Sequence, residues 1–163
     1  MRTVRSVPTV SLFLVLAAIS TSAQPSAKQR LHGTWELTRW EVFDAAGGPS
    51  RPGTYDRGRV IYDAGSGNMS AHLMSSANKA DSAPATYADR AAAYRRYLGY
   101  WGPYTVDEKG GVITHHVAGS SNPSWVGTEQ IRYFALTADG NRLTLSLKNG
   151  DRVTQSLYWE RVK

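Results

Sequence analysis

The sequence predicts an all-β fold, an up-and-down antiparallel barrel of eight strands with one short helix packed at an opening. Segments of alternating apolar and polar residues recur along the chain, and short turns rich in Gly, Asn and Asp separate them. Consecutive strands joined by tight turns usually pair with each other, and closure of eight such strands removes the exposed sheet edges. The expected strands are residues 35–43, 59–63, 68–73, 104–107, 112–118, 129–136, 142–148 and 152–161.

One segment breaks the β pattern. Residues 80–97 are rich in Ala and Arg, and Tyr87, Tyr94 and Leu98 recur at helical spacing before Gly99, a residue type that commonly ends helices. We expect one helix here, lying across a barrel opening. The Tyr87/Tyr94 stripe is interpreted as a packing surface, and direct contact with a ligand is the alternative.

The first residues of the chain are typical of an export signal. Residues 1–23 combine two arginines, an apolar stretch at 10–19 and small residues before the expected cleavage after Ala23. The polar residues 24–30 are predicted to be a disordered leader, and residues 31–163 to form the barrel domain. The expected location is therefore outside the cytoplasm, either periplasmic or secreted.

Composition narrows the possible partners. The formal net charge is +6, and removal of two arginines with residues 1–23 leaves 17 basic and 13 acidic residues, a net charge of +4. These charges are scattered, whereas a nucleic-acid footprint needs a contiguous basic patch. The chain has no cysteine, so its stability must come from the core. No nucleic acid, no cofactor and no membrane insertion after signal cleavage is expected.

Side-chain alternation predicts the interior of the barrel. Three strands have clear inner faces: Met69, Ala71 and Leu73; Leu143, Leu145 and Leu147; Leu157, Trp159 and Arg161. In residues 112–118 the face with His115 is the more apolar, which places His115 inside and His116 outside. Adjacent residues of a strand point to opposite faces and cannot bind one metal ion together, so no metal site is expected.

The strand at 129–136 has two mixed faces, and its orientation stays open. If Arg132 points inward, it brings a permanent cation into the interior. Such a cation needs a partner, which would be Glu129, Asp107 shifted by a bulge, or an anionic ligand. The alternative is an outward Arg132 in a surface ion pair.

The two ends of the predicted barrel resemble those of lipocalins. The sequence Gly33-Thr34-Trp35 opens the first strand, and Trp159-Glu160-Arg161 ends the last. Further runs at 31–37, 58–62, 67–71, 112–117 and 122–132 resemble the bacterial and fungal lipocalin-like domain family, whose members are largely uncharacterised. The resemblance implies an eight-stranded barrel in which Trp35 closes the base and Arg161 lies across its ring, a contact worth about 0.5–2 kcal/mol.

A ligand site is predicted inside this barrel. Its expected lining is Tyr62, Met69, Tyr104, His115, Trp125, Arg132 and Trp159. Trp125 lies in an irregular Pro- and Gly-containing loop, where it serves either as a lid or ligand platform or as a plug over the core. Both interpretations stay open.

Three functions compete at this stage. The preferred one is a binding protein for a small hydrophobic or amphipathic ligand, because such sites combine apolar walls with a few polar groups. The second is an isomerase, cyclase or hydratase with His115 as its acid or base. No nucleophile elbow, carboxylate pair or cofactor motif supports that enzyme. The third is a structural envelope protein without a pocket.

Overall fold

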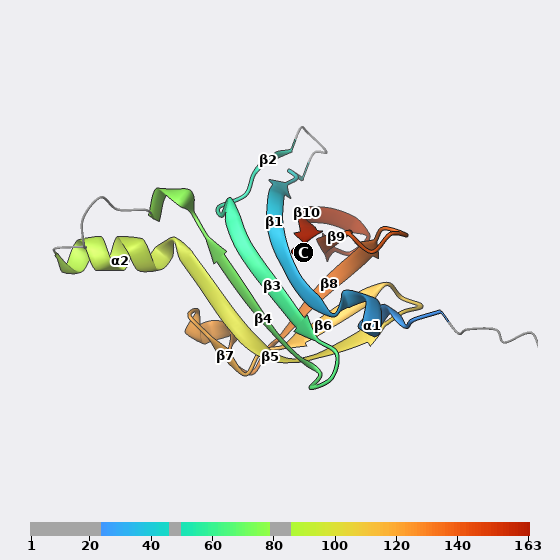
Figure 1. Cartoon of the computed structure of the whole chain (residues 1–163). Helices are drawn as coiled ribbons and strands as arrows, with labels where there is room; N and C mark the ends of the chain where they lie inside the picture. The colour runs from blue at the N-terminus through green and yellow to red at the C-terminus, as the bar shows by residue number, and fades with distance from the viewer. Residues whose placement is uncertain (1–23, 46–49, 79–85) are drawn as a thin grey trace, which may run out of the picture.

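Eight antiparallel strands close into a barrel in the computed structural model, which describes residues 24–45, 50–78 and 86–163 (Figure 1). The barrel strands are β1 (Gly33–Val42), β3 (Arg57–Asp63), β4 (Asn68–Met74), β5 (Tyr97–Asp107), β6 (Val112–His116), β8 (Glu129–Leu136), β9 (Arg142–Asn149) and β10 (Arg152–Arg161). Each pairs with the next, and β10 pairs with β1 to complete the circle. The predicted up-and-down barrel is confirmed.

Short elements decorate this barrel. The strand β2 (Arg51–Pro52) pairs with the end of β1, and β7 (Gly119–Ser120) pairs with β5. Two single-turn 3-10 helices, η1 (Ser76–Asn78) and η2 (Pro123–Trp125), lie in connections. No helix in the described part of the chain has both the length and the apolar character needed to cross a membrane.

The predicted helix is present but shorter. The helix α2 (Tyr87–Arg95) begins with a capping box between Thr86 and Asp89, and strand β5 starts at Tyr97, seven residues before the predicted start at residue 104. Residues 97–103 were not predicted as strand, since Leu98 continued the helical spacing and Gly99 was expected to end the helix, whereas pairing with β4 holds them in the sheet.

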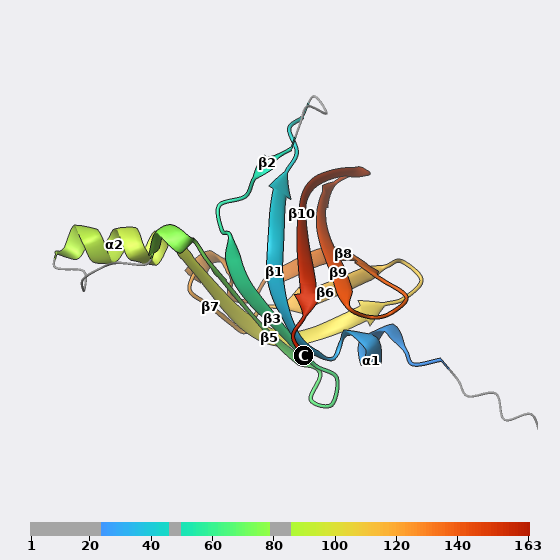
Figure 2. The ribbon, with the colours of Figure 1, turned by 45° about the horizontal axis from the view of Figure 1, so that its top comes forward.

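The helix α2 projects away from the barrel, and only its last turn reaches the opening (Figures 1 and 2). Tyr87 and Tyr94 are 80% and 55% exposed, so the interpretation of these tyrosines as a packing stripe is wrong. No residue of α2 is buried, because the helix carries Ala, Arg and Asp where a core-facing stripe needs larger apolar side chains.

The expected disordered leader contains a helix instead. The helix α1 (Ala27–Leu31) is opened by a capping box in which the Ser26 and Gln29 side chains bond each other's backbone. Leu31 is fully buried, and Arg30 donates a 2.8 Å hydrogen bond to the carbonyl oxygen of Thr137. These contacts hold the segment across the barrel end opposite α2 (Figure 1).

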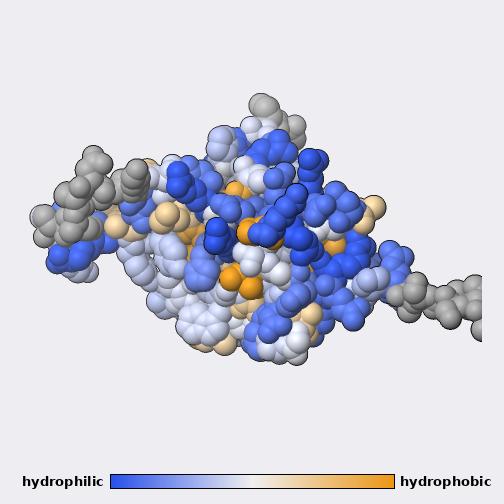
Figure 3. All heavy atoms as spheres, viewed as in Figure 1, coloured by the Kyte–Doolittle hydropathy of each residue, from blue (hydrophilic) through white to orange (hydrophobic). Residues whose placement is uncertain are grey.

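The inner faces follow the alternation predicted from the sequence. Met69, Ala71 and Leu73 on β4, Leu143 and Leu145 on β9, and Leu157 and Trp159 on β10 are buried. In β6 and β8, the face that carries His115 and the face that carries Arg132 point into the barrel. His115 is 1% exposed and Arg132 is 8% exposed. The outer surface seen in Figure 3 is mostly hydrophilic, with small hydrophobic groups over the strands.

A β-bulge in β1 changes which residues face inward. The register of β1 on β10 shifts between Leu37 and Arg39, so one strand gains a residue over its partner. The shift reverses the alternation, and both Trp35 and Trp40 point to the interior although they have opposite parity.

Trp35 and Arg161 meet at the closed end of the barrel. The guanidinium carbon of Arg161 lies 4.1 Å from the centroid of the Trp35 ring. The contact implied by the resemblance is therefore present. The contact between Arg161 and Trp35 closes the barrel end that α1 covers. The cavity lies toward the opposite end.

Candidate functional site

The barrel interior contains a cavity of about 520 Å³. It occupies the half of the barrel next to α2 and the η2 loop, away from α1. Aliphatic and aromatic side chains make most of its wall, and a few polar groups interrupt them. The principal residues are Trp40, Tyr55, Val60, Ala71, Leu73, Leu98, Tyr100, His115, Asn122, Trp125, Arg132, Leu145, Leu147, Gln155, Leu157 and Trp159.

His115 lies at the floor of this cavity between two tyrosines. Its Nε2 is 2.9 Å from the hydroxyl oxygen of Tyr62, and its Nδ1 is 3.0 Å from that of Tyr100. A neutral imidazole has one N–H donor and one acceptor nitrogen, so one tyrosine donates to the ring and the other accepts from it. Both ring nitrogens are thereby occupied.

The three members of this network are held neutral. Burial lowers the pKa of His115 well below its ordinary value. The charge of Arg132 lowers this pKa further, and His116 makes the smallest contribution. Burial also raises the pKa values of Tyr62 and Tyr100. The floor of the cavity therefore carries polar but uncharged groups beside one cation.

That cation is Arg132, on β8. Its Nη1 donates a 2.9 Å hydrogen bond to the Ile131 carbonyl oxygen, and its Nη2 lies 3.5 Å from Oε1 of Gln130. Both acceptors are neutral. Of the two orientations left open by the sequence, the inward one is the one adopted.

Trp125 covers Tyr100 at the side of the cavity. The two rings meet edge to face with centroids 5.4 Å apart, and Trp125 is half-buried. Asn122 begins the single turn η2 by accepting a hydrogen bond from the backbone N–H of Ser124. Trp125 thus forms part of the cavity wall from a loop that is itself fixed by a side-chain cap.

The structure separates the predicted lining residues into two groups. His115, Trp125, Arg132 and Trp159 line the cavity. The other three, Tyr62, Met69 and Tyr104, are buried in the packed core nearer α1 and do not line it, because Tyr62 and Tyr104 fill that half of the barrel with rings 5.0 Å apart. Of these three, Tyr62 is linked to the site through its bond to His115.

Sequence reasoning missed Tyr100 and Trp40. Tyr100 fell between the predicted helix and the predicted start of β5, although Tyr100, Gly102 and Tyr104 alternate as a buried strand face. Trp40 was not predicted to point inward, because no pattern in the local sequence marks the bulge that reverses the alternation before it. Its ring stacks on Tyr55 with centroids 5.5 Å apart, at the rim of the cavity.

Metal binding has no structural support in the described residues, which contain no group of three or more His, Asp or Glu side chains placed to hold an ion. His116, on the outer face, instead pairs with Glu129 at 3.2 Å.

The closed eight-stranded barrel with an internal cavity and a Trp–Arg closure defines a barrel of the lipocalin type. The family described as "Lipocalin-like domain" matches residues 32–162, and the chain belongs to this family. No curated protein matches the sequence.

Two solved structures are similar to the chain. A lipocalin-like protein from Bacteroides uniformis is 13% identical, with a TM-score of 0.49 over 82% of this chain and 99% of the other. A redesigned beta barrel is 12% identical, with a TM-score of 0.43 over 87% of this chain and 100% of the other.

Proposed function

We propose that this protein is an exported binding protein that holds a small, partly apolar molecule inside the barrel. The observation that carries the proposal is the cavity of about 520 Å³, whose wall is mainly aliphatic and aromatic with a few polar groups at its floor. Small-molecule sites have this composition, and their volumes are roughly 300–1,000 Å³. A barrel filled by its own side chains would have excluded any such ligand.

The contacts of His115 favour binding over the alternative of proton-transfer catalysis. A general base must present a free lone pair to its substrate, and a general acid a free proton. Both nitrogens of His115 are instead bonded to Tyr62 and Tyr100 at 2.9 and 3.0 Å. In this network His115 serves to fix the two hydroxyl groups.

Filling the cavity should weaken ligand binding. Ala71 lies on the inner face of β4 and lines the cavity, so the ring of an Ala71→Phe variant occupies space that the ligand needs. We expect the variant to bind the neutral apolar fluorophore N-phenylnaphthylamine at least about tenfold more weakly than wild type, equivalent to about 1.4 kcal/mol. Fluorescence titration measures this difference.

The matched control makes the same change on the outside. Ala135 lies exposed on β8, and Ala135→Phe should leave the affinity for the fluorophore unchanged. Circular dichroism checks that both variants fold. Equal binding by wild type and a folded Ala71→Phe variant would show that the fluorophore does not enter the barrel.

Export is tested by the mature N-terminus. The signal peptide predicted at residues 1–23 lies outside the described residues. We expect the protein recovered from the periplasm or medium of a Gram-negative host to begin at Gln24, as measured by intact mass. Recovery of the uncleaved chain from the cytoplasm alone would contradict the proposal of export.

A further inference from the structure

A buried arginine in the cavity has no acidic partner among the described residues. Arg132 is 8% exposed and lines the cavity, where a permanent cation loses most of its hydration. Buried charges in proteins are normally paired with an opposite charge, because an unpaired one is strongly destabilising. The negative charge that balances Arg132 therefore indicates what kind of ligand the cavity holds.

The two carboxylates that the sequence offered as partners of an inward Arg132 are bonded elsewhere. Glu129 lies outside the barrel and contacts His116 at 3.2 Å. Asp107 caps its own turn by accepting hydrogen bonds from the backbone N–H groups of Lys109 and Gly110, at 3.1 and 3.0 Å. Among the described residues, no Asp or Glu lines the cavity, and none lies within ion-pair distance of Arg132.

The groups that do contact Arg132 are neutral and leave donors to spare. A guanidinium has five N–H donors, and the Ile131 carbonyl and the Gln130 amide oxygen account for two of them. The Tyr100 hydroxyl is a further neutral partner of Arg132, because burial raises the pKa of this hydroxyl and keeps it protonated near neutral pH. The second cation on the cavity wall, Arg95, is exposed at the mouth, so both charged side chains that line the cavity are positive.

The rest of the wall suits an apolar body. Leu73, Leu145, Leu147 and Leu157 line the cavity between the floor and the mouth. One guanidinium balances one negative charge, and its planar fork matches a carboxylate in a two-pronged contact. A dianionic head would leave one charge uncompensated in the same space.

We propose that the ligand is an amphipathic organic monoanion, a carboxylate whose head lies against Arg132 and whose apolar body fills the cavity toward the mouth. This inference deepens the proposed function and rests on it. It also gives Arg132 the counter-charge that no described residue supplies.

Three probes with the same apolar chain test the charge preference. Decanoate, decanol and decyltrimethylammonium are compared as competitors of N-phenylnaphthylamine in wild-type protein near neutral pH. Charge-assisted contact in a buried site predicts that decanoate displaces the fluorophore at about tenfold to a hundredfold lower concentration than decanol. The cationic probe should be the weakest of the three.

The outcomes separate the inference from the proposed function. Equal displacement by decanoate and decanol overturns the carboxylate proposal and leaves the proposed binding function intact. If neither the fluorophore nor decanoate binds, with decanoate also measured directly by calorimetry, both proposals fail. Direct binding of decanoate without fluorophore binding supports both.

Variants assign the preference to Arg132. We expect Arg132→Met to weaken decanoate binding by about tenfold or more and to change decanol binding by less than about twofold. The control Arg59→Met removes an exposed arginine on the outer face of β3, which pairs with Glu36, and should keep the wild-type preference. Arg132→Gln, which retains a polar group, repeats the test if Arg132→Met does not fold. A decanoate preference that persists in a folded Arg132 variant overturns the assignment.

Discussion

Replacement of Trp35 by Ala should lower the free energy of unfolding by about 3–5 kcal/mol, the range observed when a buried large aromatic is truncated. Trp35 is fully buried, and its indole N–H donates a 2.9 Å hydrogen bond to the Leu31 carbonyl oxygen, which ties α1 to the barrel. Its loss leaves a hole at the closed end and removes the ring beneath Arg161. Urea unfolding followed by circular dichroism measures the change.

Arg161 makes the effect of Trp35→Ala larger than a cavity alone. Its guanidinium donates to the carbonyl oxygens of His32, Arg30 and Gly140 at 2.6, 2.6 and 2.8 Å, and the Trp35 ring supports it in that position. The control is Trp101→Ala, because Trp101 is 58% exposed on the outer face of β5. We expect that control to cost less than about 1 kcal/mol. Similar losses for the two variants would show that the closed end does not depend on this packing.

Acidification below about pH 6.5 should destabilise the protein through His115. In the unfolded chain His115 has an ordinary pKa near 6.5, whereas in the folded barrel its pKa is held well below that value. The unfolded state therefore binds more protons in this window, and stability rises with pH. The contribution of His115 to the free energy of unfolding is fully present above about pH 6.5. Below that pH it falls by up to about 1.4 kcal/mol per pH unit.

The His115→Gln variant isolates this contribution. It removes the titrating ring but keeps one donor and one acceptor for Tyr62 and Tyr100. Its free energy of unfolding, measured by urea at about pH 5 and about pH 7.5, should change less between the two conditions than that of wild type, by up to about 2 kcal/mol. Whatever the substitution costs near neutral pH does not enter this comparison.

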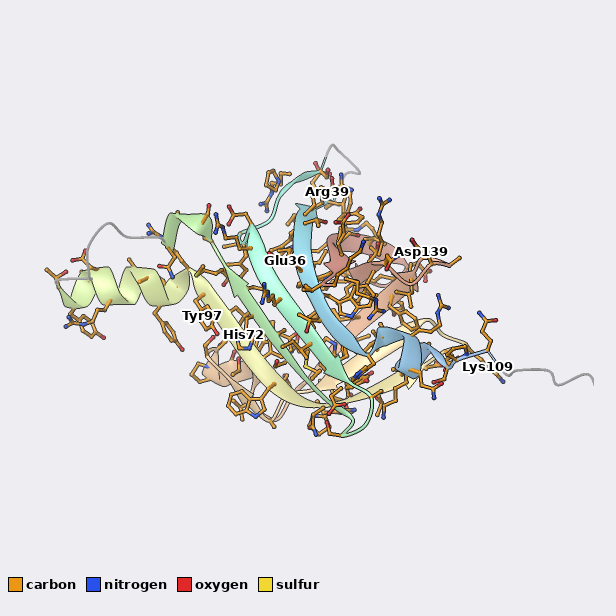
Figure 4. The ribbon with its side chains drawn as sticks, viewed as in Figure 1. Glu36, Arg39, His72, Tyr97, Lys109 and Asp139 are labelled. Atoms are coloured by element: carbon orange, nitrogen blue, oxygen red, sulfur yellow. The ribbon has the colours of Figure 1, made fainter. Side chains whose placement is uncertain are left out.

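A histidine on the outer face provides the matched control. His72 lies exposed beside Tyr97, with its Nδ1 2.7 Å from the tyrosine hydroxyl (Figure 4). His72→Gln should keep the wild-type pH dependence. The carboxyl groups with lowered pKa values, such as Asp63 and Asp139, the latter at about 2, contribute stability that is lost only at more acidic pH. A pH dependence in His115→Gln as large as that of wild type would contradict the assignment to His115.

Much of the barrel was predictable because its signals are local. Seven strands begin and end within two residues of their predicted limits, since turns rich in Gly, Asn and Asp punctuate alternating segments. The error at β5 arose where two periodicities overlap: Tyr94 and Leu98 fit a helix, and Tyr100 and Tyr104 fit a strand. Pairing of β5 with β4, a long-range contact, decides between them.

The candidate site was predictable in part. His115 was placed inward because its neighbours on that face, Ile113 and Val117, are apolar, and the structure buries all three. Tyr62 and Tyr104 were also expected to line the cavity, yet they fill the core beneath it. Alternation tells which face a side chain occupies, but it does not tell how far along the barrel axis that side chain lies.

The amino-acid sequence by itself determined the eight strands, their order and most of their inner faces, and it identified the Trp35–Arg161 closure through a family resemblance. Only the tertiary structure decided that Trp40 points inward, that residues 27–31 form α1 and that Arg132 enters the cavity with no acidic partner in the described part of the chain. The physical reason is the same in each case. A bulge, the docking of a terminal helix and the pairing of a buried charge depend on residues that are distant in sequence and meet only when the barrel closes.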